Sequence, residues 1–364
     1  MNSLLKFMCA LAAVVWSVAS SEVGRAETKS ERINAGAVAV VADQLGSQSL
    51  NYAADLADVV GHENDLRILP IAGHGPVEAI RDVIYLRGID GAIVPSDVLA
   101  YMKKQNMLED LDENIAYLAR FGSPQLHIIA RKDIGALADL AGRRVNIGSA
   151  AEARFVTANL VFETLGLKVE PVDGNELDAV EQLRKGDVDA IVLVAEQPSP
   201  FAAELAKDGK FKLLSVAMDD ELGKTYLPSM LNDPAYSGLL EGEGGLETLS
   251  MSYVFAVFNA EKGTERYNKF KKLADVLYPA ISDLQSGRRY ADWSHVNMSA
   301  SVPGWTRYAT AEEWLAQKKK KPDKPDPADV SALRQQFRAM TGEGQLGEAT
   351  TRTRYEKWRE SQLQ

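Results

Sequence analysis

A short phrase that leads from a helix through a glycine into an apolar strand occurs twice in this chain. Residues 86–94 read LRGIDGAIV, and residues 183–192 read LRKGDVDAIV. A basic residue and a glycine are typical of a helix C-terminus, because a cation is favourable at the negative end of the helix dipole and glycine adopts positive φ. The β-branched run that follows predicts a buried parallel strand. Two such units favour two α/β lobes that face one cleft, although helix–glycine–strand units also recur by chance in any α/β protein.

The other periodic segments extend this α/β pattern over most of the chain. Strands are expected at 37–42, 66–71, 90–94, 125–130, 213–216 and 253–258, and helices at about 52–60, 77–86, 152–165, 264–286 and 311–318. The alternation predicts mainly parallel sheets flanked by helices, with right-handed crossovers. Residues 225–249 are rich in Gly, Pro and Ser, and are expected to be irregular.

The N-terminal segment, residues 1–26, is typical of a secretory signal peptide. Lys6 precedes an apolar run at 7–19, and cleavage is plausible after Ser20 or Ala26. The run is too short to cross a bilayer and no second long one follows, so we expect a periplasmic chain without stable membrane insertion once the signal is cleaved; a membrane-anchored form is the alternative. The single cysteine, Cys9, lies in this run. The exported chain would therefore have no disulfide, Cys-ligated zinc or thiol nucleophile.

Charge and motif content argue against several classes of function. The formal net charge is −10, and no RNA- or DNA-binding motif occurs, so no nucleic-acid partner is expected. The sequence lacks the nucleophile elbow, the HExxH motif, the phosphate-binding loop and the dinucleotide glycine pattern. The four histidines have no metal-ligand spacing. We therefore expect neither an enzyme nor a metal or other cofactor.

Loops that follow the expected strands supply the candidate ligand contacts, since ligands of open α/β sheets lie beyond the carboxyl ends of strands. Free N–H groups between a strand and a helix attract an anion, and hydroxyl and amide groups add donors. The residues after the phrase at 86–94 can also act only as a helix cap. The candidates in the first lobe are Gly46, Ser47, Gln48, Ser49, Gly73, His74, Ser96 and Asp97.

The expected second lobe repeats this geometry on the opposite wall of the cleft. Arg154 can donate two parallel hydrogen bonds to a carboxylate ligand, and Glu152 can pair with an ammonium group. The alternative is an exposed pair on the first turn of a helix. Phe201 suits either an apolar cleft wall or the core. The candidates here are Gly148, Ser149, Ala150, Glu152, Arg154, Glu196 and Phe201.

Several of these stretches resemble a known family. Residues 137–167 (LADLAGRRVNIGS…LVFETLGL) are similar to the second lobe of type II periplasmic solute-binding proteins. Residues 88–98 (GIDGAIVPSDV), 126–131 (LHIIAR) and 190–198 resemble the TAXI family, the solute receptors of tripartite ATP-independent periplasmic (TRAP) transporters. The resemblance extends over about 37–315. It breaks where the family has GGTYY and this chain has GSQSL (46–50), and where the family has GSGT and this chain has AEAR (151–154).

The resemblance implies a two-lobed type II fold with a ligand cleft at the hinge. Lobe 1 would comprise residues 35–122 and 255–317, lobe 2 would comprise 123–254, and 318–364 would form a charged linker and helical tail. The implied function is capture of a small anionic ligand, a carboxylate or amino acid, for delivery to a TRAP membrane permease. The alternatives are a periplasmic sensor that presents its bound state to a receptor kinase and an enzyme on the same two-lobed scaffold.

Overall fold

The computed structural model describes residues 36–60, 66–242, 244–286, 289–294 and 296–319. The expected signal peptide and residues 320–364 of the expected tail lie outside these ranges. Over the described ranges, no helix combines the length and apolar character needed to cross a membrane.

The first sheet has five strands in the order β2-β1-β3-β12-β4. Their bounds are β1 (Ala37–Ala42), β2 (Arg67–Ala72), β3 (Gly91–Pro95), β4 (Ile115–Phe121) and β12 (Tyr253–Phe258). Strands β1 and β3 pair in parallel, whereas β12 lies antiparallel between β3 and β4. The first sheet is therefore mixed.

The helices that follow these strands are α3 (Gln48–Val60), α4 (Pro76–Tyr85), α5 (Val98–Lys104), α6 (Leu111–Asn114), α10 (Glu265–Leu277), α11 (Ile281–Gln285) and α12 (Ala309–Lys319). Helix α3 contacts β2 and β3, and α12 packs on α10 and β4. The single helix expected over 264–286 is wrong, since Pro279 lies between α10 and α11. Proline lacks the N–H that an uninterrupted helix needs.

The second sheet has the order β10-β11-β5-β8-β6-β7, with β9 also paired to β5. Its strands are β5 (Gln125–Arg131), β6 (Arg144–Asn146), β7 (Glu170–Val172), β8 (Ala190–Ala195), β9 (Phe211–Leu213), β10 (Leu227–Leu231) and β11 (Leu246–Ser250). Strand β6 pairs in parallel with β7 and β8, but β5 pairs antiparallel with β8, β9 and β11. The expectation of mainly parallel sheets is wrong in this respect, although the α/β fold class is confirmed.

The irregular segment expected at 225–249 contains an antiparallel strand pair. Strands β10 and β11 pair from Leu227↔Ser250 to Leu231↔Leu246. The glycines belong to the connection between them, where Gly242, Gly244 and Gly245 all have positive φ. The average composition of the segment did not reveal the two short strands, one before and one after a glycine-rich connection.

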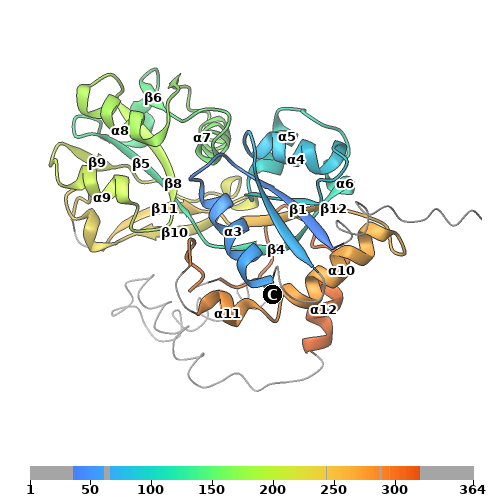
Figure 1. The fold of residues 1–364 in the computed structure, drawn as a ribbon. Coiled ribbons are helices and arrows are strands. Elements are labelled where there is room, and N and C mark those ends of the chain that lie inside the picture. The colour runs from blue at the N-terminus through green and yellow to red at the C-terminus, as the bar shows by residue number, and fades with distance from the viewer. Residues whose placement is uncertain (1–35, 61–65, 243, 287–288, 295, 320–364) are drawn as a thin grey trace, which may run out of the picture. The chain divides into compact units, whose positions relative to one another are not determined.

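The helices of the second sheet are α7 (Ala153–Thr164), α8 (Glu176–Lys185) and α9 (Pro200–Ala206), with 3₁₀ turns at Leu137–Leu140, Leu222–Lys224 and Pro234–Tyr236. Helix α8 contacts β8, and α9 contacts β9 (Figure 1). Both copies of the repeated phrase have the expected structure, α4 into β3 and α8 into β8. Gly186 caps α8 with a φ of 75°, the positive value expected of glycine at this position.

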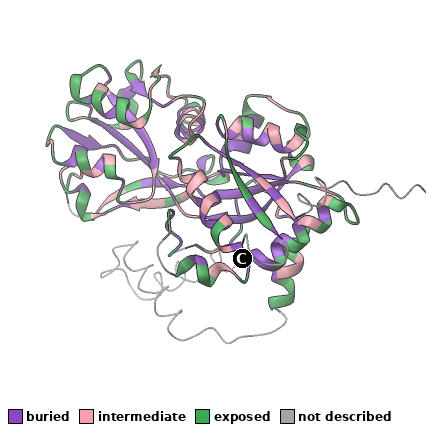
Figure 2. Cartoon of the chain, in the orientation of Figure 1, coloured by how far each residue is buried: buried purple, intermediate pink, exposed green. Residues whose placement is uncertain are grey.

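The chain crosses between the two sheets twice. It leaves the first sheet after Phe121, returns after Ser250, and continues in β12. Tyr253 and Val254, which were expected to end lobe 2, belong to β12 of the first sheet. Most strands of both sheets are buried, whereas the edge strands β2, β7 and β10 are mostly exposed or half-buried (Figure 2). One apolar cluster contains residues of both, including Val94 and Val192.

Candidate functional site

A cavity of about 430 Å³ lies where five segments meet. The loop after β1 and the first residue of β12 contribute from the first sheet. The segment that begins α7, the N-terminal turn of α8 and the loop after β8 contribute from the second. Most of these segments follow the carboxyl ends of strands, where open α/β sheets place their ligand sites.

About half of the residues singled out from the sequence line this cavity. Those that do are Gly46, Ser47, Gln48, Glu152, Arg154, Glu196 and Phe201. Those that the structure places away from its walls are Ser49, Gly73, His74, Ser96, Asp97, Gly148, Ser149 and Ala150.

Ser49 stabilises the loop after β1 through hydrogen bonds of its buried hydroxyl group. Its buried Oγ accepts a hydrogen bond from the Asp43 N–H at 3.0 Å and lies 3.1 Å from Ser47 Oγ. Ser47 Oγ in turn accepts from Leu50 N at 3.3 Å, as an N-cap does. The two hydroxyl groups expected to bind ligand therefore stabilise the start of α3.

Ser96 and Asp97 lie inside the protein, which corrects their assignment to the cleft. Ser96 Oγ accepts from the N–H of Ser252 at 3.1 Å. Asp97 is fully buried, and its Oδ2 accepts from Thr157 Oγ1 at 2.6 Å and from Tyr226 Oη at 3.0 Å. The side chain of Asp97 thus joins the loop after β3 to helix α7 and to the residue before β10.

The loop after β2 packs against other segments of the chain and does not line the cavity. Gly73 lies against β1, and His74 is exposed. Gly75 has a φ of +115°, and a Cβ atom built on it would lie 2.6 Å from the carbonyl oxygen of Ala150 and 2.7 Å from Cα of Ala151. Only glycine fits this close approach of the β2–α4 loop to the segment before α7.

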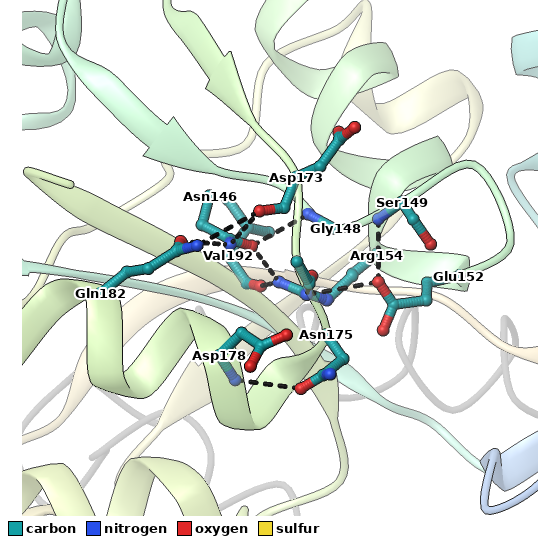
Figure 3. A network of polar contacts seen from close by, with 11 residues as sticks. Asn146, Gly148, Ser149, Glu152, Arg154, Asp173, Asn175, Asp178, Gln182 and Val192 are labelled. Atoms are coloured by element: carbon teal, nitrogen blue, oxygen red, sulfur yellow. Dashed lines mark hydrogen bonds and ion pairs between the residues drawn. The ribbon is translucent and has the colours of Figure 1, made fainter. Parts of the chain in front are cut away.

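The backbone donors expected to bind an anion before α7 are occupied. The N–H of Gly148 donates to Asn146 Oδ1 at 3.1 Å, and the N–H of Ser149 donates to Glu152 Oε2 at 2.9 Å (Figure 3). Both acceptors are side chains of the protein itself. These two N–H groups are therefore unavailable to an anionic ligand in this conformation.

Arg154 is the centre of this polar network (Figure 3). Its side chain is 2% exposed, and Nη1 donates to Asn146 Oδ1 at 2.8 Å and to the Val192 carbonyl at 3.1 Å. Its Nη2 donates to Glu152 Oε2 at 3.3 Å and to the Gly174 carbonyl. The alternative of an exposed pair on the helix surface is wrong, because burial and four protein acceptors hold the guanidinium in the wall.

Glu196 and Phe201 form the wall after β8. Glu196 Oε1 accepts from Tyr52 Oη and from the N–H of Ser123, both at 3.1 Å, so this carboxyl links α3 to the β4–β5 connection. Phe201 is half-buried and packs against the apolar cluster beneath α8 and α9. Phe201 therefore both lines the cavity and packs against the core, the two alternatives that the sequence left open.

Five polar residues of the cavity were missed from the sequence, namely Gln44, Asn175 and three with ionisable side chains. Asp43 is the first residue after β1, Glu176 is the first residue of α8, and Tyr253 is the first residue of β12. The signal for Asp43 was present, since it is the first polar residue after a predicted strand. Tyr253 gave no such signal, because it reads as one more apolar residue of a buried strand.

The cavity carries more negative than positive groups. Four carboxyl side chains line it, from Asp43, Glu152, Glu176 and Glu196, together with the single guanidinium of Arg154. Over the described ranges, no three His, Cys, Asp or Glu side chains are grouped so that they could hold a metal ion.

Burial and mutual repulsion change the protonation of these groups. Burial raises the pKa of Asp43 to about 7; the Ser49 hydrogen bond opposes this rise, and the charge of Glu152 adds to it. Burial also raises the pKa of Glu176. The pKa of Tyr253 is raised well above its usual value, mainly by burial and then by the charges of nearby carboxylates, first of them Asp43.

Asp43 should make the unfolding free energy depend on pH. The usual pKa of an aspartate is 3.8, whereas the pKa of Asp43 is about 7 in the folded chain, so between these values the folded state retains a proton that the unfolded state has released. Stability therefore falls as pH rises across this window and levels off above about 7. We expect Asp43→Asn to lack this fall in urea unfolding measured across the window.

The informative quantity is the difference between Asp43→Asn and the unsubstituted chain. His127 contributes a slope of opposite sign below its usual pKa, because burial lowers its pKa to about 4. That slope is common to both proteins and cancels in the difference. Parallel stability curves would show that Asp43 titrates normally.

The sequence of most of the cavity segments matches a known protein family. The model of the NMT1-like family matches residues 45–230, which is more than half of the chain. The chain belongs to the NMT1-like family. The match begins in the loop after β1 and ends in β10, so it includes nearly all of the second-sheet segments that line the cavity.

Solved periplasmic binding proteins are similar to this NMT1-like chain at low identity. A TctC solute-binding protein from Polaromonas is 16% identical, with a TM-score of 0.45 over 78% of this chain and 94% of that one. The periplasmic aliphatic sulphonate-binding protein of Escherichia coli is 16% identical, with a TM-score of 0.38 over 89% and 93%. The arginine-binding protein of T. maritima is 15% identical, with a TM-score of 0.41 over 71% and 95%.

Proposed function

We propose that this chain is an exported solute receptor that holds one small organic molecule in the cavity. The observation that carries the proposal is the origin of the cavity walls. The loop at Gly46–Gln48 and Tyr253 come from first-sheet elements, whereas Glu152 and Glu196 come from the second. A molecule in the cavity would contact both sets and favour the conformation that brings them together, by its differential affinity for that conformation.

The partner that reads the bound state belongs to the same proposal. The resemblance to TAXI receptors supports a TRAP permease in the inner membrane as that partner, with the exported chain in the periplasm. Uptake of the bound solute by vesicles that contain the permease, only when the receptor is added, would support delivery. A sensor that acts through a receptor kinase would bind the same solute without stimulating uptake.

A panel of small metabolites tests the receptor function directly. We expect at least one solute to raise the unfolding temperature of the chain, since a ligand that binds only the folded state stabilises it by mass action. The same solute should reduce the radius of gyration in small-angle scattering as the cavity walls approach each other. Failure of every solute to stabilise the chain, together with an unchanged radius, would contradict the proposal.

A further inference from the structure

The charge around the cavity is unbalanced in a way that limits its ligand. Of the five ionisable groups that Asp, Glu and Arg contribute, four are carboxyls. The one guanidinium, on Arg154, already donates to four protein oxygens through Nη1 and Nη2, which leaves only its Nε without a partner among the described residues. The cavity wall therefore offers a ligand far more acceptor than donor capacity.

Asp43 provides an independent observation. Asp43 lines the cavity and is 2% exposed, and its Oδ1 has no hydrogen-bond partner within the described part of the chain. A buried acceptor without a donor destabilises the structure that contains it. A donor supplied by the ligand would remove this cost, and a positively charged donor would also lessen the repulsion between Asp43 and Glu152.

A purely anionic ligand lacks comparable partners. The N–H groups of Gly148 and Ser149 donate to protein side chains. The cavity also includes the first residues of α3, α7 and α8, and an acidic residue lies at or near each of these starts: Asp43 in the loop before α3, Glu152 before α7 and Glu176 in α8. An anion bound there would be close to an acidic side chain and would face further carboxyls across the cavity.

Apolar side chains complete the walls. Leu45 is 82% exposed and Leu177 is 61% exposed, and both line the cavity from opposite sheets. The half-buried ring of Phe201 lies between the same walls. Large exposed leucines at a cavity mark a surface that gains free energy when an apolar group covers it.

We propose that the cavity binds a small organic cation, an ammonium or guanidinium group on an apolar carbon skeleton, with its charged nitrogen beside Asp43 and its skeleton on Leu45, Leu177 and Phe201. This inference rests on the proposed receptor function and specifies its ligand class. Of the two classes expected from the sequence, an amino acid satisfies it through its ammonium group. A simple carboxylate does not.

A pair of probes that differ only in the charged group tests this inference. Butylammonium and butyrate have the same four-carbon skeleton, so calorimetric titration of the full exported chain with each compares charge alone. We expect saturable binding of butylammonium and none of butyrate. Asp43→Asn should weaken butylammonium binding about ten- to a hundredfold, as expected for loss of a charged hydrogen bond.

Two further variants keep the test decisive. Glu170→Gln removes one negative charge from the exposed part of β7, away from the cavity, and should leave butylammonium affinity unchanged. If Asp43→Asn fails to fold, Glu176→Gln removes a second cavity carboxyl and should also weaken binding. Butyrate binding as tight as that of butylammonium, or no saturable binding of butylammonium, would overturn the inference.

The result also separates this inference from the receptor function. Stabilisation by neutral or anionic members of the metabolite panel alone would leave the receptor function standing and overturn the ligand class. Stabilisation by no solute at all would instead contradict the receptor function.

Discussion

Replacing Arg154 with alanine is expected to lower the unfolding free energy by about 3–5 kcal/mol, as for removal of one partner of a buried ion pair. The guanidinium is buried and donates to Asn146, Glu152, Val192 and Gly174. Alanine would remove one donor from each of these acceptors and leave Glu152 without its cationic partner. Urea unfolding of the purified variant measures the loss, and Arg154→Lys should restore only part, since an ammonium cannot reproduce the planar fork.

Arg184 offers a matched control for this variant. It also pairs with two carboxylates, Glu204 and Asp208, but its side chain is 35% exposed. Arg184→Ala should cost no more than about 1 kcal/mol, because solvent screens an exposed pair. If Arg154→Ala and Arg184→Ala were equally stable, the buried network could not be an important source of stability.

Gly75→Ala is expected to have the second large effect. With φ of 115° and ψ of 167°, Gly75 occupies a region that is essentially restricted to glycine, at a strain of about 1–3 kcal/mol for other residues. The added methyl would also overlap backbone atoms of Ala150 and Ala151. The β2–α4 loop and the segment before α7 should therefore separate, which hydrogen exchange at residues 150–153 would detect alongside a fall in stability.

Gly88→Ala is a control that separates the effect of backbone strain from the effect of the close approach at Gly75. Gly88 has a φ of +90°, yet a Cβ atom there would meet no described atom within 4 Å. This variant carries backbone strain without overlap, and exchange at 150–153 should stay as in the unsubstituted chain. Equal exchange in the two variants would mean that the close approach at Gly75 does not keep the two segments together.

Local signals in the sequence predicted the elements well. The repeated helix–glycine–strand phrase identified α4 with β3 and α8 with β8, since caps and apolar runs are encoded within a few residues. The loop at Gly46–Gln48 and the loop at Glu196 were correctly expected to line a cavity by the rule for strand ends. The direction of the strands was harder to predict than their positions. Strands β5 and β12 lie antiparallel to their neighbours, and strand pairing depends on residues that are far apart in the chain.

The roles of individual polar residues could not be read from their position in a loop. Asp97 follows a strand as a ligand-binding residue would, but Thr157 and Tyr226 cover it in the folded chain. Arg154 was expected either to bind a ligand carboxylate or to lie in an exposed pair on a first helical turn, but in the folded chain it donates to Asn146, Gly174 and Val192. Apart from Asn146, which is eight residues from Arg154, these partners are at least 20 residues away, and no pattern within the loop identifies them.

The exposed Leu45 also makes the chain suited to conversion into an optical sensor. Its side chain is 82% exposed at the cavity, and the only cysteine in the sequence, Cys9, lies in the segment expected to be removed on export. Leu45→Cys would then give the exported chain one thiol to carry an environment-sensitive dye. Fluorescence of that dye would report how polar the cavity mouth is, and so whether a solute has displaced its water.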